Sequence, residues 1–173
     1  MRFLKLGLCL TCCVALAGVM SEAAMARTMT TAPVVGDDPV HPVVVPYPVP
    51  EMAQAQLQAA IARAKVSGKP VLLDFGGNWS PDCWSLSGVL AIPAVSAWIA
   101  QNFEVVVVNV SRRNTNLGIG ENYGVEITAV PSVLIVSSDG KALNAGTIGA
   151  LSNASKMTPQ SIVDQLAAWG KLN

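Results

Sequence analysis

The chain has 173 residues, with 11 basic and 11 acidic side chains and a formal net charge of zero. Hydrophobic residues make up 51% and charged residues 13%, which supplies a sizeable core and excludes wholesale disorder. The neutral balance also lacks the electrostatic signature of a protein that binds nucleic acid or an anionic membrane. One histidine and four cysteines, three of them within the first 13 residues, do not predict a metal site, and we expect no cofactor.

Residues 1–26 have the three-part pattern of a secretory signal peptide. A basic start is followed by an apolar run over residues 6–19, and Ala24 and Ala26 provide the small side chains that signal peptidase requires. This run is shorter than the about 20 residues that a transmembrane helix needs, although an uncleaved anchor is the alternative. We therefore predict a periplasmic or secreted protein with no membrane span after cleavage, which keeps Cys83 as its single cysteine.

Residues 27–50 are predicted to form a proline-rich linker ahead of a domain that covers residues 51–173. Six prolines in this stretch favour an extended conformation without internal hydrogen bonds. His41 is expected to be a solvated residue of the linker.

Apolar periodicity, β-branched runs and turn signals predict the elements of the domain. The predicted helices begin near Glu51, Pro81, Pro93, Leu117 and Thr158, and the predicted strands cover residues 71–75, 103–110, 133–136 and 141–146. This alternation indicates an α/β fold whose central sheet is partly parallel and carries helices on both faces. The turn signal Asp139–Gly140 predicts a hairpin, which makes the sheet mixed.

Three short motifs occur in an order and at a spacing that are typical of a known family. They are Asp74–Phe75, Trp79-x-Pro81-x-Cys83 and Val130–Pro131. With them the chain resembles the thioredoxin family, and more closely its exported bacterial branch, over Glu51 to Lys171. The resemblance implies a thioredoxin-like fold and a site for thiol–disulfide exchange.

The resemblance also implies a role for each matched position. In the family, a first cysteine attacks as a thiolate at the helix N-terminus, and Ser80 occupies that position here. Cys83 matches the second cysteine, which resolves the mixed disulfide. Asp74 matches a buried acid behind that cysteine. Pro131 matches a cis-proline whose flanking backbone, at Val130, pairs with extended substrate.

Ser80 changes the chemistry that the family pattern implies. Serine forms no disulfide, and the only histidine, which could serve as a base, lies in the predicted linker. A dithiol cycle within one chain is therefore excluded. Ser80 also suits a purely structural role, because a serine at a helix N-cap accepts a backbone N–H bond.

Several roles stay open from the residues alone. Cys83 is either an inert core thiol or a monothiol that reacts with glutathione or a partner's disulfide. Asp74 needs a partner inside an apolar strand, and Ser80, Cys83, water, Lys65 and Lys69 are the candidates. Trp79 is either the lip of a substrate surface or packing.

Two functions compete at this stage. The first is a client-binding or chaperone-like module that uses Trp79, Val130 and Pro131 to hold an extended peptide or protein. The alternative is monothiol exchange through Cys83, linked to glutathione or acting as an isomerase. We expect a monomer in either case.

Overall fold

The computed structural model describes residues 28–38 and 40–172, so the predicted signal peptide lies outside the described residues. The elements follow in the order η1 (Pro50–Met52), α1 (Ala53–Ser67), β1 (Val71–Gly76), α2 (Pro81–Leu90), α3 (Pro93–Asn102), β2 (Glu104–Asn109), α4 (Leu117–Glu121), β3 (Ser132–Val136), η2 (Ala145–Thr147), η3 (Ala154–Lys156) and α5 (Pro159–Gly170). The predicted helices are present, and α4 is a short helix of five residues.

The sheet has three strands in the order β2-β1-β3. β1 pairs in parallel with β2, with Leu73 opposite Val106, and antiparallel with β3, with Leu73 opposite Leu134. The mixed sheet that the sequence predicted is therefore confirmed. β1 is buried along its whole length because it is the central strand and is covered on both faces.

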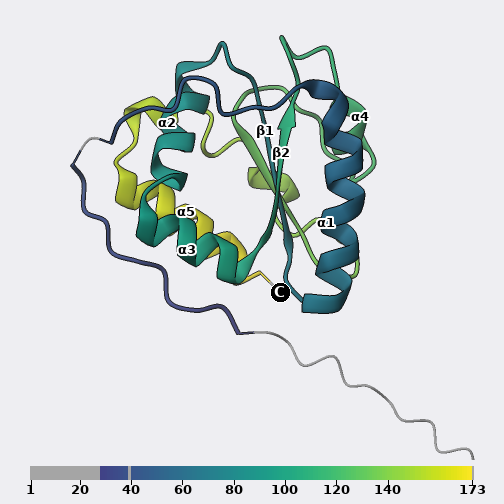
Figure 1. The fold of residues 1–173 in the computed structure, drawn as a ribbon, viewed down its shortest axis with the longest axis horizontal. Coiled ribbons are helices and arrows are strands. Elements are labelled where there is room, and N and C mark those ends of the chain that lie inside the picture. Colours follow the sequence, from purple (N-terminus) through teal and green to yellow (C-terminus); the bar gives the residue numbers. More distant parts are fainter. Residues whose placement is uncertain (1–27, 39, 173) are drawn as a thin grey trace, which may run out of the picture.

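Helices cover both faces of the sheet, as Figure 1 shows, with α1 and α4 on one side and α2, α3 and α5 on the other. Side chains alternate along a strand, so β1 contributes to two separate cores. Leu73 and Phe75 pack in the core beneath α1, and Leu72 packs in the core beneath α2, α3 and α5. Within the described residues no single helix is long and apolar enough to cross a membrane, although α2 and α3 reach that length together and are bent by 83°.

The predicted strand over residues 141–146 is wrong. Only one bridge forms there, between Val136 and Ala142. The side chain of Asn144 replaces the backbone ladder, because its Oδ1 accepts the N–H of Ile135 at 2.8 Å and its Nδ2 donates to the C=O of Val133 at 2.9 Å. Because the Asn144 side chain satisfies the N–H of Ile135 and the C=O of Val133, the residues after it do not pair with β3 and turn into η2.

The segment before η1 also differs from the linker that we expected. Residues 28–38 and 40–49, called the N-terminal arm from here on, contain no helix or strand but pack along the domain (Figure 1). The N–H of Thr30 donates to Asn102 Oδ1 at 2.9 Å, and the N–H of Val43 donates to the C=O of Trp84 at 3.1 Å. At Gly88 a Cβ would lie 2.5 Å from the carbonyl oxygen of His41, so this glycine permits the close approach.

Candidate functional site

A buried hydrogen bond connects the N-terminal arm to β1. Asp74 is 1% exposed and Tyr47 is 3% exposed. The Tyr47 hydroxyl donates to Asp74, at 2.9 Å from Oδ1 and 3.1 Å from Oδ2. A Cβ at Gly76 would lie 2.1 Å from the Tyr47 hydroxyl oxygen and 2.7 Å from Cys83 Sγ. Gly76 therefore leaves the space in which the phenol and the thiol meet.

Burial controls the protonation of this pair. Burial raises the pKa of Asp74 to about 7, and the hydrogen bond from Tyr47 offsets part of that effect by favouring the carboxylate. Burial, with the charge of Asp74 added to it, raises the pKa of Tyr47 far above its usual range. Tyr47 therefore stays protonated and donates, while Asp74 changes its charge near neutral pH.

Cys83 lies at the same place and has no exposed surface. Burial raises the pKa of the Cys83 thiol above its ordinary value, and the charge of Asp74 acts in the same direction. Hydrogen bonds that involve Ser80, Gly77 and Tyr47 lower it but do not reverse the shift. The thiol is therefore protonated at neutral pH and shielded from reagents in the folded protein.

Ser80 is the N-cap of α2, which confirms the structural role expected for it. Its backbone is extended, at φ −100° and ψ 120°, and its Oγ accepts the N–H of Cys83 at 3.3 Å. Pro81 follows at the first helical position, where the missing N–H costs nothing. Ser80 is 3% exposed, so its hydroxyl is a buried cap in this state.

Trp79, which precedes α2, forms a hydrogen bond to the loop that follows β2. Its side chain is 38% exposed, and its indole Nε1 donates to the C=O of Ser111. Ser111, Arg113 and Asn116 in this loop have positive φ angles of 51°, 62° and 59°. Such conformations are costly for residues other than glycine, and clusters of them are typical of functional sites.

The same loop reaches the segment that precedes β3. Nη1 of Arg113 donates to the C=O of Thr128 at 2.6 Å. The Val130–Pro131 peptide bond is cis, and both side chains are buried. The backbone N–H and C=O of Val130 are unpaired among the described residues.

The structure brings Asp74, Ser80 and Cys83 together and connects Trp79 with Val130 and Pro131 through one loop. The prediction that Lys65 or Lys69 could be the partner of Asp74 is wrong, because Tyr47 donates to this carboxyl group. Lys69 instead donates to the C=O of Ala100 at 2.7 Å and lies 3.9 Å from Glu104.

Sequence reasoning missed Tyr47, which supplies the partner of Asp74 from the arm. One feature of the sequence could have indicated Tyr47: it is the single Phe, Trp or Tyr in the proline-rich residues 27–50. An aromatic residue in a free linker would leave a large apolar surface in water. Among the described residues, no cluster of three or more His, Cys, Asp or Glu side chains could hold a metal ion.

Comparisons with known proteins show the family and the fold of the chain. The model of the thioredoxin-like family matches residues 52–138. The solved structure of a disulphide isomerase from Xylella fastidiosa Temecula1 is 38% identical, with a TM-score of 0.67, over 72% of this chain and 95% of that one. The structure of a DsbH oxidoreductase is similar in fold, with 14% identity and a TM-score of 0.50, over 83% of this chain and 96% of that one. No curated protein matches the chain.

Proposed function

Because the chain belongs to the thioredoxin-like family, we propose that it is an exported protein that binds extended polypeptide clients without dithiol chemistry. Export is supported by the signal pattern of residues 1–26 and the client class by the open backbone at Val130. The buried cap Ser80 and the shielded thiol of Cys83 leave no attacking thiolate on the surface.

One observation carries this proposal. Val130 has a free N–H and a free C=O beside Pro131, and the half-exposed Trp79 is connected to that segment by the loop at Ser111 and Arg113. Unpaired backbone groups can hydrogen-bond to the backbone of an extended client. An aromatic side chain next to them adds apolar contact, and neither interaction requires a particular client sequence. Such a surface functions equally well when no disulfide is present.

A cysteine-free extended peptide labelled with a fluorophore tests the proposal by fluorescence polarisation. Trp79→Ala should weaken binding about tenfold, because truncating an aromatic anchor removes a large share of the contact energy. Val66→Ala, which truncates an apolar side chain on α1 that is 91% exposed, is the matched control and should bind as the wild type does. Binding should be the same in oxidising and reducing buffer. If no member of a peptide library binds, the proposal is wrong.

The disulphide isomerase relative makes monothiol exchange the competing function, and Cys83 alkylation separates the two. We expect iodoacetamide to react with Cys83 in the folded protein at least about 100-fold more slowly than in denaturant, because the thiol is buried and its pKa is raised. Mass spectrometry at several pH values measures both rates. A fast reaction with an apparent pKa below that of free cysteine, together with a glutathione adduct, would favour the monothiol enzyme.

A further inference from the structure

β2 has a free edge. It is the outer strand of the sheet and pairs only with β1 among the described residues. The N–H of Glu104 donates to Pro70 and the N–H of Val110 donates to Gly76, both at 2.9 Å. Successive residues of a strand direct their backbone groups to opposite edges, so the even-numbered residues between these two face β1. The N–H and C=O groups of Val105 and Val107 therefore face outward.

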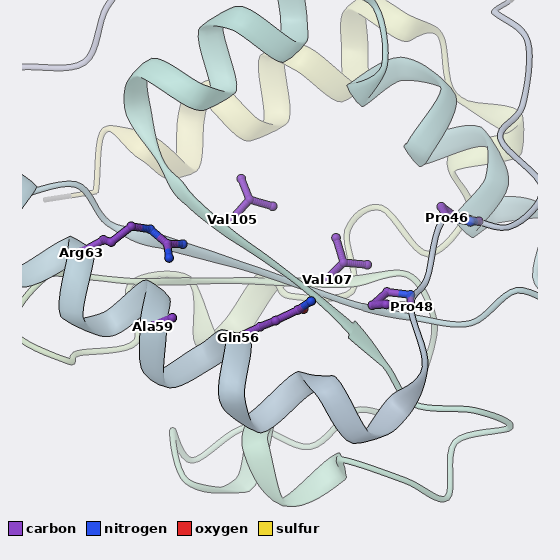
Figure 2. Close-up of a pocket in the computed structure, with 7 residues that line it drawn as sticks. All are labelled: Pro46, Pro48, Gln56, Ala59, Arg63, Val105 and Val107. Carbon is purple, nitrogen blue, oxygen red and sulfur yellow. The ribbon is translucent and has the colours of Figure 1, made fainter.

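A hollow of about 400 Å³ lies along this edge (Figure 2). It is lined by Val105 and Val107 of β2, by Gln56, Ala59 and Arg63 of α1, and by Pro46 and Pro48 of the N-terminal arm. No described residue accepts from the amides of Val105 and Val107. We call this hollow the β2-edge groove.

Within residues 105–108, β2 itself carries no charge, proline or bulge of the kind that normally protects an exposed edge. Natural edge strands carry inward-facing charges, prolines or bulges that prevent pairing with another chain. Here residues 105–108 are four consecutive valines without a bulge. The one cation at the groove, Arg63, is neutralised because its Nε lies 2.6 Å from Glu104 Oε2. The groove therefore presents unpaired backbone groups in an uncharged, largely apolar setting.

We propose that the β2-edge groove binds an uncharged, extended polypeptide segment by adding it as a strand to β2. Unpaired N–H and C=O groups at alternate residues match the backbone of an extended chain. A second copy of β2 does not fit, because it would be recessed between its own α1 and its own arm, and two hollows cannot meet. The groove shares no lining residue with the surface at Trp79 and Val130, so this site is independent of the function proposed above.

Amide exchange followed by NMR tests the site on the protein without residues 1–26. The probe is a capped octapeptide of alternating valine and serine. Binding should slow exchange of the Val105 and Val107 amides at least about tenfold, whereas the amides of Val106 and Val108 already donate to β1 and should not change. N-methylation of the same peptide at every second residue removes the N–H groups along one edge of the extended chain, so that edge cannot pair with β2. One of the two N-methylated isomers should therefore fail to bind and the other should bind.

Two substitutions on α1 make the test specific. Ala59→Arg fills the groove and should weaken the peptide at least about tenfold. Ala62→Arg makes the same change on an exposed position that does not line the groove, and it should leave affinity unchanged. In addition, Val107→Pro removes one outward N–H without removing a bond to β1 and should weaken binding about fivefold.

The readouts separate this proposal from the function proposed above. Unchanged exchange at Val105 and Val107 in the presence of saturating peptide would overturn the groove as a site, and so would equal effects of Ala59→Arg and Ala62→Arg. If Trp79→Ala abolishes binding while Ala59→Arg does not, the peptide uses the Val130 surface and this inference is wrong. If Ala59→Arg weakens binding and Trp79→Ala does not, the groove is the site.

Discussion

Replacing Ser80 with cysteine should convert this protein into an active disulfide reductase. The Ser80 side chain is at the N-cap of α2 and contacts Cys83. A thiol at a helix N-terminus has a lowered pKa and becomes an attacking thiolate. Cys83 would resolve the mixed disulfide, and the carboxylate of Asp74 beside it would accept the thiol proton. In a single turnover the dithiol of the reduced Ser80→Cys variant supplies both electrons and is itself oxidised to a disulfide. We expect it to reduce a model disulfide at least about 100-fold faster than the wild type does.

Two further variants show whether the gain comes from the pair of thiols. Ser80→Cys combined with Cys83→Ser keeps the attacking thiol but has no resolving thiol, and it should accumulate a mixed disulfide without turnover. Ser80→Ala removes the cap and should cost about 1 kcal/mol of stability without creating activity. If Ser80→Cys forms no intramolecular disulfide in oxidised glutathione, the arm that brings Tyr47 onto Cys83 prevents the family chemistry.

The fold could be predicted because several local signals agreed. Gly68 ends α1 at φ 71°, a left-handed conformation that favours glycine, and Thr158 caps α5 through the N–H of Ser161. The β-branched run at Val105–Val108 forms β2, and the apolar run that contains Asp74 forms the central strand. Each of these depends on residues close together in the sequence, where propensity and capping decide the outcome.

The parts that the sequence did not predict depend on contacts over long separations. Asn144 interrupts the predicted strand because its amide happens to reach both Val133 and Ile135. Tyr47 binds Asp74 across 27 residues, and no periodic pattern marks such a pair. A proline-rich stretch predicts only an extended backbone, and whether it packs depends on the domain surface. On the domain surface, Gly88 permits the close approach of the His41 backbone because it has no Cβ.

Tyr47 also explains why the buried acid is tolerated. A buried carboxyl without a donor would be costly in its ionised form. Tyr47 donates to both of its oxygens, and it fills the space next to Cys83. The arm thus supplies the hydrogen-bond donor of Asp74 and covers the buried side of Cys83.

The stability of the protein should fall as pH rises through neutrality, and Asp74→Asn should remove this dependence. The pKa of Asp74 is about 7 when folded, above its ordinary value of 3.8, so the native state holds the proton to a higher pH than the unfolded state does. Stability is therefore highest below the unfolded value and falls as pH rises toward the folded value. Almost all of the loss between pH 5 and pH 8 falls below pH 7, so at 1.36 kcal/mol per pH unit it is about 3 kcal/mol.

Urea unfolding of the wild type, Asp74→Asn and Asp38→Asn at pH 5 and pH 8 measures this effect. Asp38→Asn makes the same chemical change at an exposed position of the arm and should retain the pH dependence. Tyr47→Phe removes the bond that favours the carboxylate, so the pKa of Asp74 should rise further and the loss at pH 8 should grow by about 2 kcal/mol. In the Asp74→Asn background, the stability lost through Tyr47→Phe should no longer depend on pH, because the carboxylate that Tyr47 stabilises is absent. A pH dependence that survives Asp74→Asn would place the responsible carboxyl elsewhere and would contradict the assignment of the buried pair.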